Sequence, residues 1–220
     1  MNIILGIISI ILCFGTIVVL EKLFKKEGLY IWISIATIIA NILVCKTINV
    51  IGFTSSLGNI MFASVFLATD IMTEKYGTEH SKKAVLLGMI SAIIFVVSTQ
   101  ISLLYIPDTT DLAQESMKNL FGINLRTSIA SLTMYFISNI LGIWIFEKIK
   151  KKFPNKLWLR NNVSTIIANC SENYCFAFIA FLGILDIQVI LSIATVGSIL
   201  EILIAICDTP FLYIATKNKT

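Results

Sequence analysis

The stretch Asn2–Leu20 reads NIILGIISIILCFGTIVVL and contains no charged residue. A helix needs about 20 mostly apolar residues to cross the hydrocarbon core of a bilayer, so this stretch is long enough to span it. It has neither the basic segment nor the small-residue cleavage site of a secretory signal peptide. We therefore interpret it as a retained first membrane helix.

The composition extends this interpretation to the whole chain. Of its 220 residues, 57% are hydrophobic and only 14% are charged. Soluble domains carry about 25% charged residues, which is what covers their water-facing surface. The composition therefore excludes a soluble globular enzyme, a disordered chain and a nucleic-acid-binding protein. It predicts one integral-membrane domain over residues 1–220, built as an all-α bundle of membrane helices.

Six more apolar stretches follow the first, which gives a bundle of seven spans, with six as the alternative. We expect a tight turn between Gly52 and Gly58, and the linker Asp108–Gly122 is either a short interfacial helix or a loop. The predicted spans are Asn2–Leu20, Leu29 to about Gly52, Leu57–Met72, Ala84–Pro107, Thr127–Phe146, Asn161–Gly183 and Ile187–Tyr213.

The basic residues predict the orientation of these spans. Alternate connections carry 14 of the 17 Lys and Arg residues on one side of the membrane and two on the other, and Lys46 falls inside a predicted span. Cytoplasmic loops of membrane proteins are enriched in Lys and Arg. The asymmetry therefore predicts an N-terminus outside and a C-terminus in the cytoplasm, and it explains the net charge of +4.

The chain offers few residues for catalysis or for binding a metal. Its five cysteines lie in apolar stretches without a C-x-x-C spacing, and His80 is the single histidine. Neither an H-E-x-x-H motif nor a Walker motif occurs. We therefore predict no catalytic residues, no metal, no cofactor and no ATP hydrolysis by the chain itself.

Polar residues at membrane depth are costly and usually face the interior of a bundle. Five of them lie about 9 to 13 residues into their predicted spans, at roughly one level between the bilayer centre and its inner third. They are Asn41, Asp70, Asn139, Asn169 and Glu172. A shared level predicts one polar layer with ligand-binding groups.

Several of these residues have a purely structural alternative. Asparagines at membrane depth also join helices through hydrogen bonds. Lys46 near the outer interface can extend to the lipid headgroups, while Glu74 and Asp208 near the cytoplasmic boundary can be solvated. A ligand-binding role is favoured for Asp70 and Glu172, which are the hardest to explain in these ways.

The deeper Glu201 has a functional or a paired role, and both remain open. Aromatic rings in the spans either stack on a planar ligand or pack the helices. The rings considered for stacking are Phe66, Tyr135, Trp144 and Tyr174.

The segment Phe66–Gly77, FLATDIMTEKYG, precedes a basic pair at Lys82 and Lys83. It resembles the signature of the queuosine precursor transporters, also called the vitamin uptake transporter family, which reads roughly D-I-L-T-E-x-Y-G before a basic pair. Weaker similarities in the same order extend the resemblance from about residue 41 to residue 213. They are Asn41-x-x-x-x-Lys46, Arg126-x-x-x-x-Ser131 with Tyr135, Leu157-Trp-Leu-Arg160-Asn161 with Ser164-Thr165, and Thr209-Pro210-x-x-Tyr213.

Two positions depart from the family pattern. The family usually has S-Q-x-x-D in the fifth span, where this chain has Ser138-Asn139-x-x-Gly142. It has Q-x-x-D in the sixth span, where this chain has Asn169-x-x-Glu172. One acid is therefore missing and the other is one methylene longer, which puts the identity of the substrate in doubt.

The resemblance implies uptake of a 7-deazaguanine base (preQ0, preQ1 or queuine) across the inner membrane for salvage into tRNA. Our hypothesis from the residue chemistry is that Glu172 binds the purine edge, that Asn139 and Asn169 add hydrogen bonds, and that Asp70 contacts a substrate amine or acts as a gate. The predicted substrate-binding residues are Asp70, Glu172, Asn169, Asn139, Asn41, Lys46, Glu74, Arg126, Tyr135, Trp144 and Tyr174.

The alternative function is a substrate-binding subunit of an ATP-driven vitamin-type uptake complex. The expected partners are the small deazapurine and membrane lipid, without direct contact to nucleic acid. A homodimer and a separate energising partner remain open.

Overall fold

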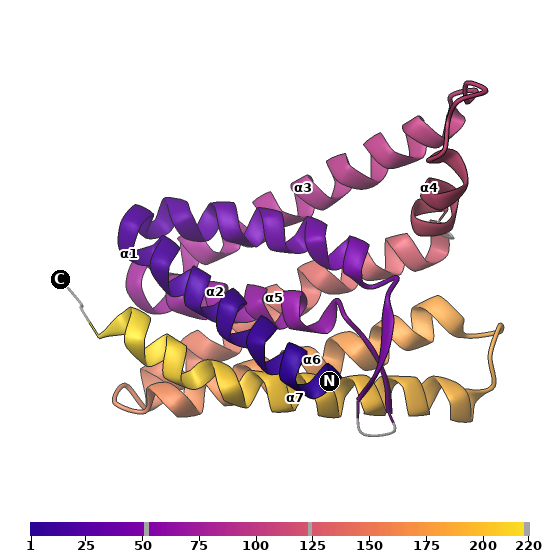
Figure 1. The fold of residues 1–220 in the computed structure, drawn as a ribbon. Coiled ribbons are helices and arrows are strands. Elements are labelled where there is room, and N and C mark those ends of the chain that lie inside the picture. Colours follow the sequence, from indigo (N-terminus) through magenta and orange to yellow (C-terminus); the bar gives the residue numbers. More distant parts are fainter. Residues whose placement is uncertain (51–52, 123–124, 218–220) are drawn as a thin grey trace.

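The computed structural model describes residues 1–50, 53–122 and 125–217, without the side chains of residues 50, 53–55 and 125–128. The described residues form seven helices and one antiparallel hairpin (Figure 1). In chain order the elements are α1 (Asn2–Leu43), β1 (Thr47–Val50), β2 (Phe53–Ser56), α2 (Asn59–Tyr76), α3 (Thr78–Leu104), α4 (Gln114–Phe121), α5 (Leu125–Lys152), α6 (Leu157–Phe181) and α7 (Ile187–Thr216).

Helix α1 contains the first two predicted spans. Its backbone leaves the helical conformation at Lys25, which has a φ of 52° and a ψ of −134°, and the two halves of α1 form a V in Figure 1. A Cβ atom on Gly28 would collide with the carbonyl group of Leu20, so the corner requires glycine at this position. The charged residues between the two apolar stretches therefore coincide with a sharp bend.

The second predicted span ends earlier than expected. Helix α1 stops at Leu43, and β1 and β2 then pair in a register that runs from Thr47 opposite Ser56 to Val50 opposite Phe53. The prediction of a helix to about Gly52 was wrong because a charge-free stretch satisfies the requirement for a span whether or not it is helical. The β-branched residues of β1 favour an extended backbone instead. Part of the expected turn, residues 51–52, lies outside the described residues.

The linker Asp108–Gly122 contains helix α4, which confirms the helical alternative for this segment. The remaining predicted spans correspond to α2, α3, α5, α6 and α7, with ends that shift by a few residues. Four helices are long and apolar enough to cross a membrane: α1, α3, α5 from Ile129 onward, and α7. The chain is thus a helical membrane protein.

Helix α2 forms the centre of the bundle. It packs against α1, α3, α5 and α7, and 13 of its 18 residues are buried. Helix α6 packs between α5 and α7. Large apolar side chains are exposed along α1, α3, α5 and α7, as expected for surfaces that face lipid tails. The central position of α2 explains how a helix with buried acidic residues is shielded from lipid.

The connections gather at the two ends of the bundle (Figure 1). The bend of α1, the α2–α3 turn at Gly77, the α5–α6 connection and the C-terminal end of α7 lie at one end, which we call the C-terminal end. The hairpin, helix α4 and the α6–α7 connection lie at the other, which we call the hairpin end. Lys75 links the first group, since its ammonium lies 2.6 Å from Glu21 and 3.2 Å from the carbonyl oxygen of Ala215.

Candidate functional site

Polar side chains gather between α5, α6 and α7 in what we call the Glu172 cluster. Hydrogen bonds define it by joining Ser138 to Glu172 and Asn173 to Glu201, and it also includes Asn139, Asn169 and Ser198, which lie within one turn of these residues along the same helices. The hydroxyl of Ser138 donates a hydrogen bond to Glu172 over 2.6 Å. The amide of Asn173 donates one to Glu201 over 2.6 Å, which joins α6 to α7. Both carboxylates are therefore held in position by a neutral donor.

Several buried atoms of this cluster have no hydrogen-bond partner among the described residues. They are Oδ1 of Asn139, both amide atoms of Asn169, and Oγ of Ser198. Leaving a buried polar group unpaired costs about 1–3 kcal/mol. Asn169 is fully buried, so an enclosed ligand could provide an acceptor for its amide N–H and a donor for its amide oxygen. The unpaired atoms therefore mark this cluster as the candidate binding site.

A second group, the Arg160 cluster, lies toward the C-terminal end of the bundle. It consists of Asp70, Glu74, Lys150, Arg160, Asn161, Thr165, Asp208 and Thr209. The guanidinium of Arg160 lies 2.7 Å from Glu74, and the ammonium of Lys150 lies 3.2 Å from the same carboxylate. Arg160 also donates to the carbonyl oxygen of Pro154 over 2.8 Å and lies over the ring of Phe146.

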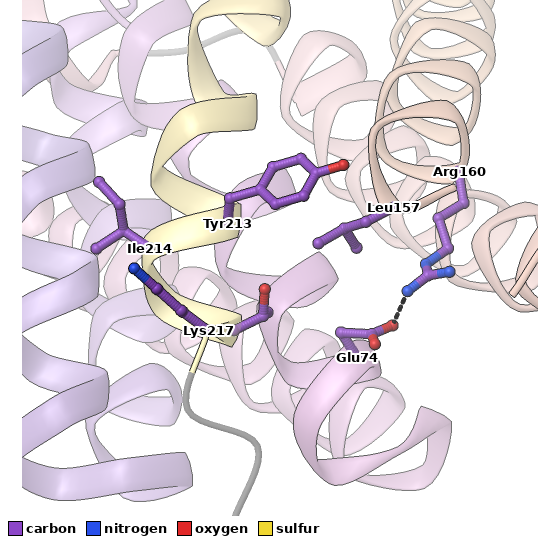
Figure 2. Close-up of a pocket in the computed structure, with 7 residues that line it drawn as sticks. Glu74, Leu157, Arg160, Tyr213, Ile214 and Lys217 are labelled. Carbon is purple, nitrogen blue, oxygen red and sulfur yellow. Dashed lines mark hydrogen bonds and ion pairs between the residues drawn. The ribbon is translucent and has the colours of Figure 1, made fainter. Parts of the chain in front are cut away.

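A pocket of about 440 Å³ opens beside this ion pair (Figure 2). Figure 2 shows Glu74 and Arg160 facing each other, with Tyr213 and Leu157 alongside. Tyr213 comes from α7 and Leu157 from the start of α6, so the pocket lies where these helices meet α2. The pocket is therefore an opening at the C-terminal end of the bundle.

The acidic residues Asp70 and Asp208 complete the Arg160 cluster. Asp208 is fully buried and accepts a hydrogen bond of 2.6 Å from Asn161. Asp70 is 2% exposed and lies 3.4 Å from the hydroxyl of Thr165. Solvation of Asp208 at the end of its span is thus wrong, because the turn of α7 that carries it packs against α6.

The two clusters lie at different depths, which corrects the single polar layer predicted from the sequence. Thr165, the partner of Asp70, precedes Glu172 by two turns of α6, or about 10 Å. Gly142 lies between the clusters, where a Cβ atom would meet Ala168 at 3.5 Å and Phe66 at 3.7 Å. Depths counted from predicted span ends were too imprecise to separate levels this close together.

Asn139, Asn169 and Glu172 are the predicted site residues in the Glu172 cluster, where Glu172 contacts Ser138, the residue before Asn139. Asp70 and Glu74 belong to the Arg160 cluster instead. Glu74 is 5% exposed and ion-paired, so solvation at the membrane boundary does not describe it.

The predicted aromatic residues lie in three different surroundings. Tyr135 is buried, with its hydroxyl 3.3 Å from that of Thr37. Trp144 is 58% exposed, and Lys148 lies over its ring. It projects away from the Glu172 cluster because residues 142 and 144 are about 200° apart around a helix. Tyr174 shares a hydrogen bond of 2.8 Å with Thr195 near the hairpin end.

Three further predicted residues lie apart from both clusters or outside the description. Asn41 is half-buried and donates to the carbonyl oxygen of Thr37 over 2.8 Å. Lys46 is exposed in the turn between α1 and β1, so its predicted place inside a helix was wrong. The side chain of Arg126 lies outside the described residues.

Glu201 and Asp208 are not among the site residues predicted from the sequence, although their spacing indicates that both lie on the packed face of one helix. The buried face of α7 repeats every three or four residues and includes Ser198, Glu201, Ala205, Asp208 and Leu212. That is the period of one helix face, which places two acids on the packed side of a largely apolar helix. Thr165 belongs to a motif quoted for the family resemblance, whereas Asn173 had no comparable signal, because it is recognisable only through its contact with α7.

Comparisons with known proteins identify the family of this chain. The family described as "Putative vitamin uptake transporter" matches residues 56–215. A protein of Bacillus subtilis (strain 168) named "Probable queuosine precursor transporter" is 34% identical over 209 residues, which cover 94% of this chain and 91% of the relative. The "Queuosine precursor transporter" of Escherichia coli (strain K12) is 28% identical over 156 residues, 68% of this chain and 67% of the relative. No solved structure matches the chain with statistical significance.

The family match covers both clusters and six of the seven helices at least in part, and the Bacillus relative aligns over almost the full length. Transporter names in the family and in its relatives imply a non-enzymatic role. With its apolar helices, this chain is a multi-pass membrane protein that belongs to the vitamin uptake transporter family.

Proposed function

We propose that this chain imports a queuosine precursor, a 7-deazaguanine base, across the cell membrane. The observation that carries the proposal is the 34% identity, over 94% of the chain, to a relative named for this activity. A buried polar cluster inside a helix bundle supports it, since polar groups at membrane depth mark substrate pathways. None of the relatives' names favours the alternative of a subunit in an ATP-driven complex.

The side chains of the Glu172 cluster can form hydrogen bonds with the groups along one edge of such a base. A 7-deazaguanine presents a ring N–H and an exocyclic amine side by side, and a carboxylate can accept from both. We assign this contact to Glu172, which Ser138 orients from α5. The unpaired amide nitrogen of Asn169 then donates a hydrogen bond to the carbonyl oxygen of the base, and the unpaired side-chain oxygen of Asn139 accepts from an N–H group of the base.

The Arg160 cluster suits a gate between this site and the cytoplasm. Asp70 lies between the Glu172 cluster and the pocket beside Glu74 and Arg160. The pocket connects α2, α6 and α7, so a shift of these helices would change access to Asp70. We therefore assign Asp70 to the exit path of the substrate.

The proposed importer crosses the membrane seven times, counting the two halves of α1 separately, with its N-terminus outside. The half of α1 that ends at Leu43 and helix α2 are each long enough to cross about 27 Å of membrane. The connections rich in Lys and Arg share the C-terminal end of the bundle in Figure 1, which the positive-inside rule assigns to the cytoplasm.

This orientation predicts which residues react from outside the cell. Cys45 is exposed at the hairpin end. In a chain whose other four cysteines are alanine, we expect a membrane-impermeant maleimide to label Cys45 in intact cells. Lys82, exposed at the C-terminal end, provides the matched control as Lys82→Cys, which we expect to react only after permeabilisation. The reverse pattern, or labelling of both from outside, would contradict the orientation.

The transport function is tested through tRNA. The chain is expressed in cells that lack queuosine synthesis and their own importer but keep the later salvage enzymes, with a queuine-inserting enzyme added where queuine is supplied. We expect nanomolar preQ0, preQ1 or queuine to restore queuosine in tRNA, scored by its retardation in boronate gels. Absence of rescue by all three bases, with the protein verified in the membrane, would refute import by this chain alone.

A further inference from the structure

Two carboxylates of the Glu172 cluster lack a cationic partner. The ion pairs of the described residues involve Glu21, Glu74, Glu79 and Glu147, but neither Glu172 nor Glu201. These two acids lie on neighbouring helices, and Asn173, the residue after Glu172, donates to Glu201 over 2.6 Å. Burying charge without a counter-ion is unfavourable, so the cluster is suited to a ligand that brings positive charge.

Glu201 is held toward this cluster by its surroundings. Asn173 donates to Glu201 over 2.6 Å and to the carbonyl oxygen of Asn169 over 3.1 Å. A Cβ atom on Gly197, one turn before Glu201, would lie only 2.9 Å from the side-chain oxygen of Asn173. Glycine at 197 therefore leaves room for the amide that orients Glu201.

A pocket of about 480 Å³ leads to this position from the hairpin end. Its lining includes Asn173, Gly197 and Leu200, which belong to the same turns as Glu201. Pockets for small ligands commonly enclose about 300–1,000 Å³, so a purine-sized molecule fits the volume. Glu201 is 8% exposed and directly follows Leu200 of this lining along α7.

The side chains near Glu172 and near Glu201 differ, which suggests a different role for each of these two acids. Glu172 adjoins the unpaired amide atoms of Asn139 and Asn169, which can read a heterocycle. Glu201 follows Ser198 by one turn on the same buried face, and the hydroxyl oxygen of Ser198 has no partner among the described residues. A carboxylate and a hydroxyl together can accept the N–H donors of an ammonium group.

We propose that Glu201, with Ser198, binds a protonated amine on the substrate, so that the protein selects deazaguanines bearing a basic amine over neutral ones. This inference rests on the proposed function and adds a specificity residue to it. Asp70 is less suited to the amine because it shares the Arg160 cluster with two cations. The selected precursors are preQ1 and queuine, and the disfavoured one is preQ0, whose side group is an uncharged nitrile.

Binding to the purified full-length protein in detergent tests this selectivity. We expect wild-type protein to bind preQ1 at least about tenfold more tightly than preQ0. In Glu201→Gln the affinity for preQ1 should fall by about tenfold or more, while that for preQ0 changes by less than about threefold. Glu201→Asp keeps the charge and should retain the preference. Glu147→Gln removes a carboxylate near the α5–α6 connection and should bind like wild type.

The outcomes separate this inference from the proposed function. Equal affinity of wild-type protein for preQ1 and preQ0 would overturn the role of Glu201 while import of deazaguanines stands, even if Glu201→Gln fails to fold. An equal loss of both ligands in Glu201→Gln would also overturn it, since a structural role predicts that result. Binding of neither preQ0, preQ1 nor queuine to wild-type protein would refute the proposed function and the inference with it.

Discussion

Glu172→Gln is expected to abolish uptake of the deazaguanine at nanomolar supply. The substitution replaces one acceptor oxygen with an amide NH₂, which then faces the N–H donors of the base. Removing one partner of a buried, charge-assisted contact costs about 2–5 kcal/mol, or at least about a 30-fold loss of affinity. Queuosine in tRNA, measured at equal amounts of protein in the membrane, reports the loss.

The matched control for this variant is Glu79→Gln. Glu79 has a side chain that is 85% exposed and pairs with Lys82 over 3.1 Å, so its removal should leave uptake unchanged. Asp70→Asn tests the second predicted acid and should reduce uptake because Asp70 lies on the proposed exit path. Full uptake by both Asp70→Asn and Glu172→Gln would show that neither acid contributes to transport.

Arg160→Met is expected to cause the largest loss of stability. It removes the guanidinium that lies 2.7 Å from Glu74, whose side chain is 1% exposed, and leaves the ammonium of Lys150 at 3.2 Å. Removing one partner of a buried ion pair costs about 3–5 kcal/mol, because the other charge stays buried. Thermal unfolding of the detergent-purified protein, followed by the loss of its monodisperse chromatographic peak, measures the effect.

The surface ion pair of Lys151 and Glu147 serves as the control for the buried pair of Arg160 and Glu74. These groups lie 3.9 Å apart, and the side chain of Lys151 is 76% exposed, so Lys151→Met should cost less than about 1 kcal/mol. The double variant Glu74→Gln/Arg160→Met should recover part of the stability because it replaces the buried carboxylate that has lost its Arg160 partner with a neutral amide. An Arg160→Met protein as stable as wild type would show that the Glu74 ion pair contributes little to the fold.

The amino-acid sequence is enough to identify a helical membrane protein and its family. Both conclusions rest on local properties. A stretch such as Asn2–Leu20 is long and apolar enough to span a bilayer regardless of its neighbours. The segment Phe66–Gly77 preserves residue types at fixed spacing, and the family match confirmed that resemblance. Asn139, Asn169 and Glu172 could also be singled out as candidates from the sequence, because charged and amide groups are rare at membrane depth.

Only the tertiary structure decided how the polar residues are grouped. Hydropathy places a residue along a span but does not say which helix faces it, so Asp70 and Glu172 were expected in one layer. Their partners Thr165 and Ser138 come from different helices and separate them by depth.

The other differences between the predictions from the sequence and the structure also arise from contacts between separate segments of the chain. Charge-free sequence cannot distinguish a helix from the hairpin that follows Leu43, since both exclude charge. The role of Glu201 depends on Asn173, which is 28 residues away in the chain and 2.6 Å away in the fold. Burial and pairing are properties of packed helices, and for that reason the geometry of the site emerged only when α5, α6 and α7 were assembled around the central helix.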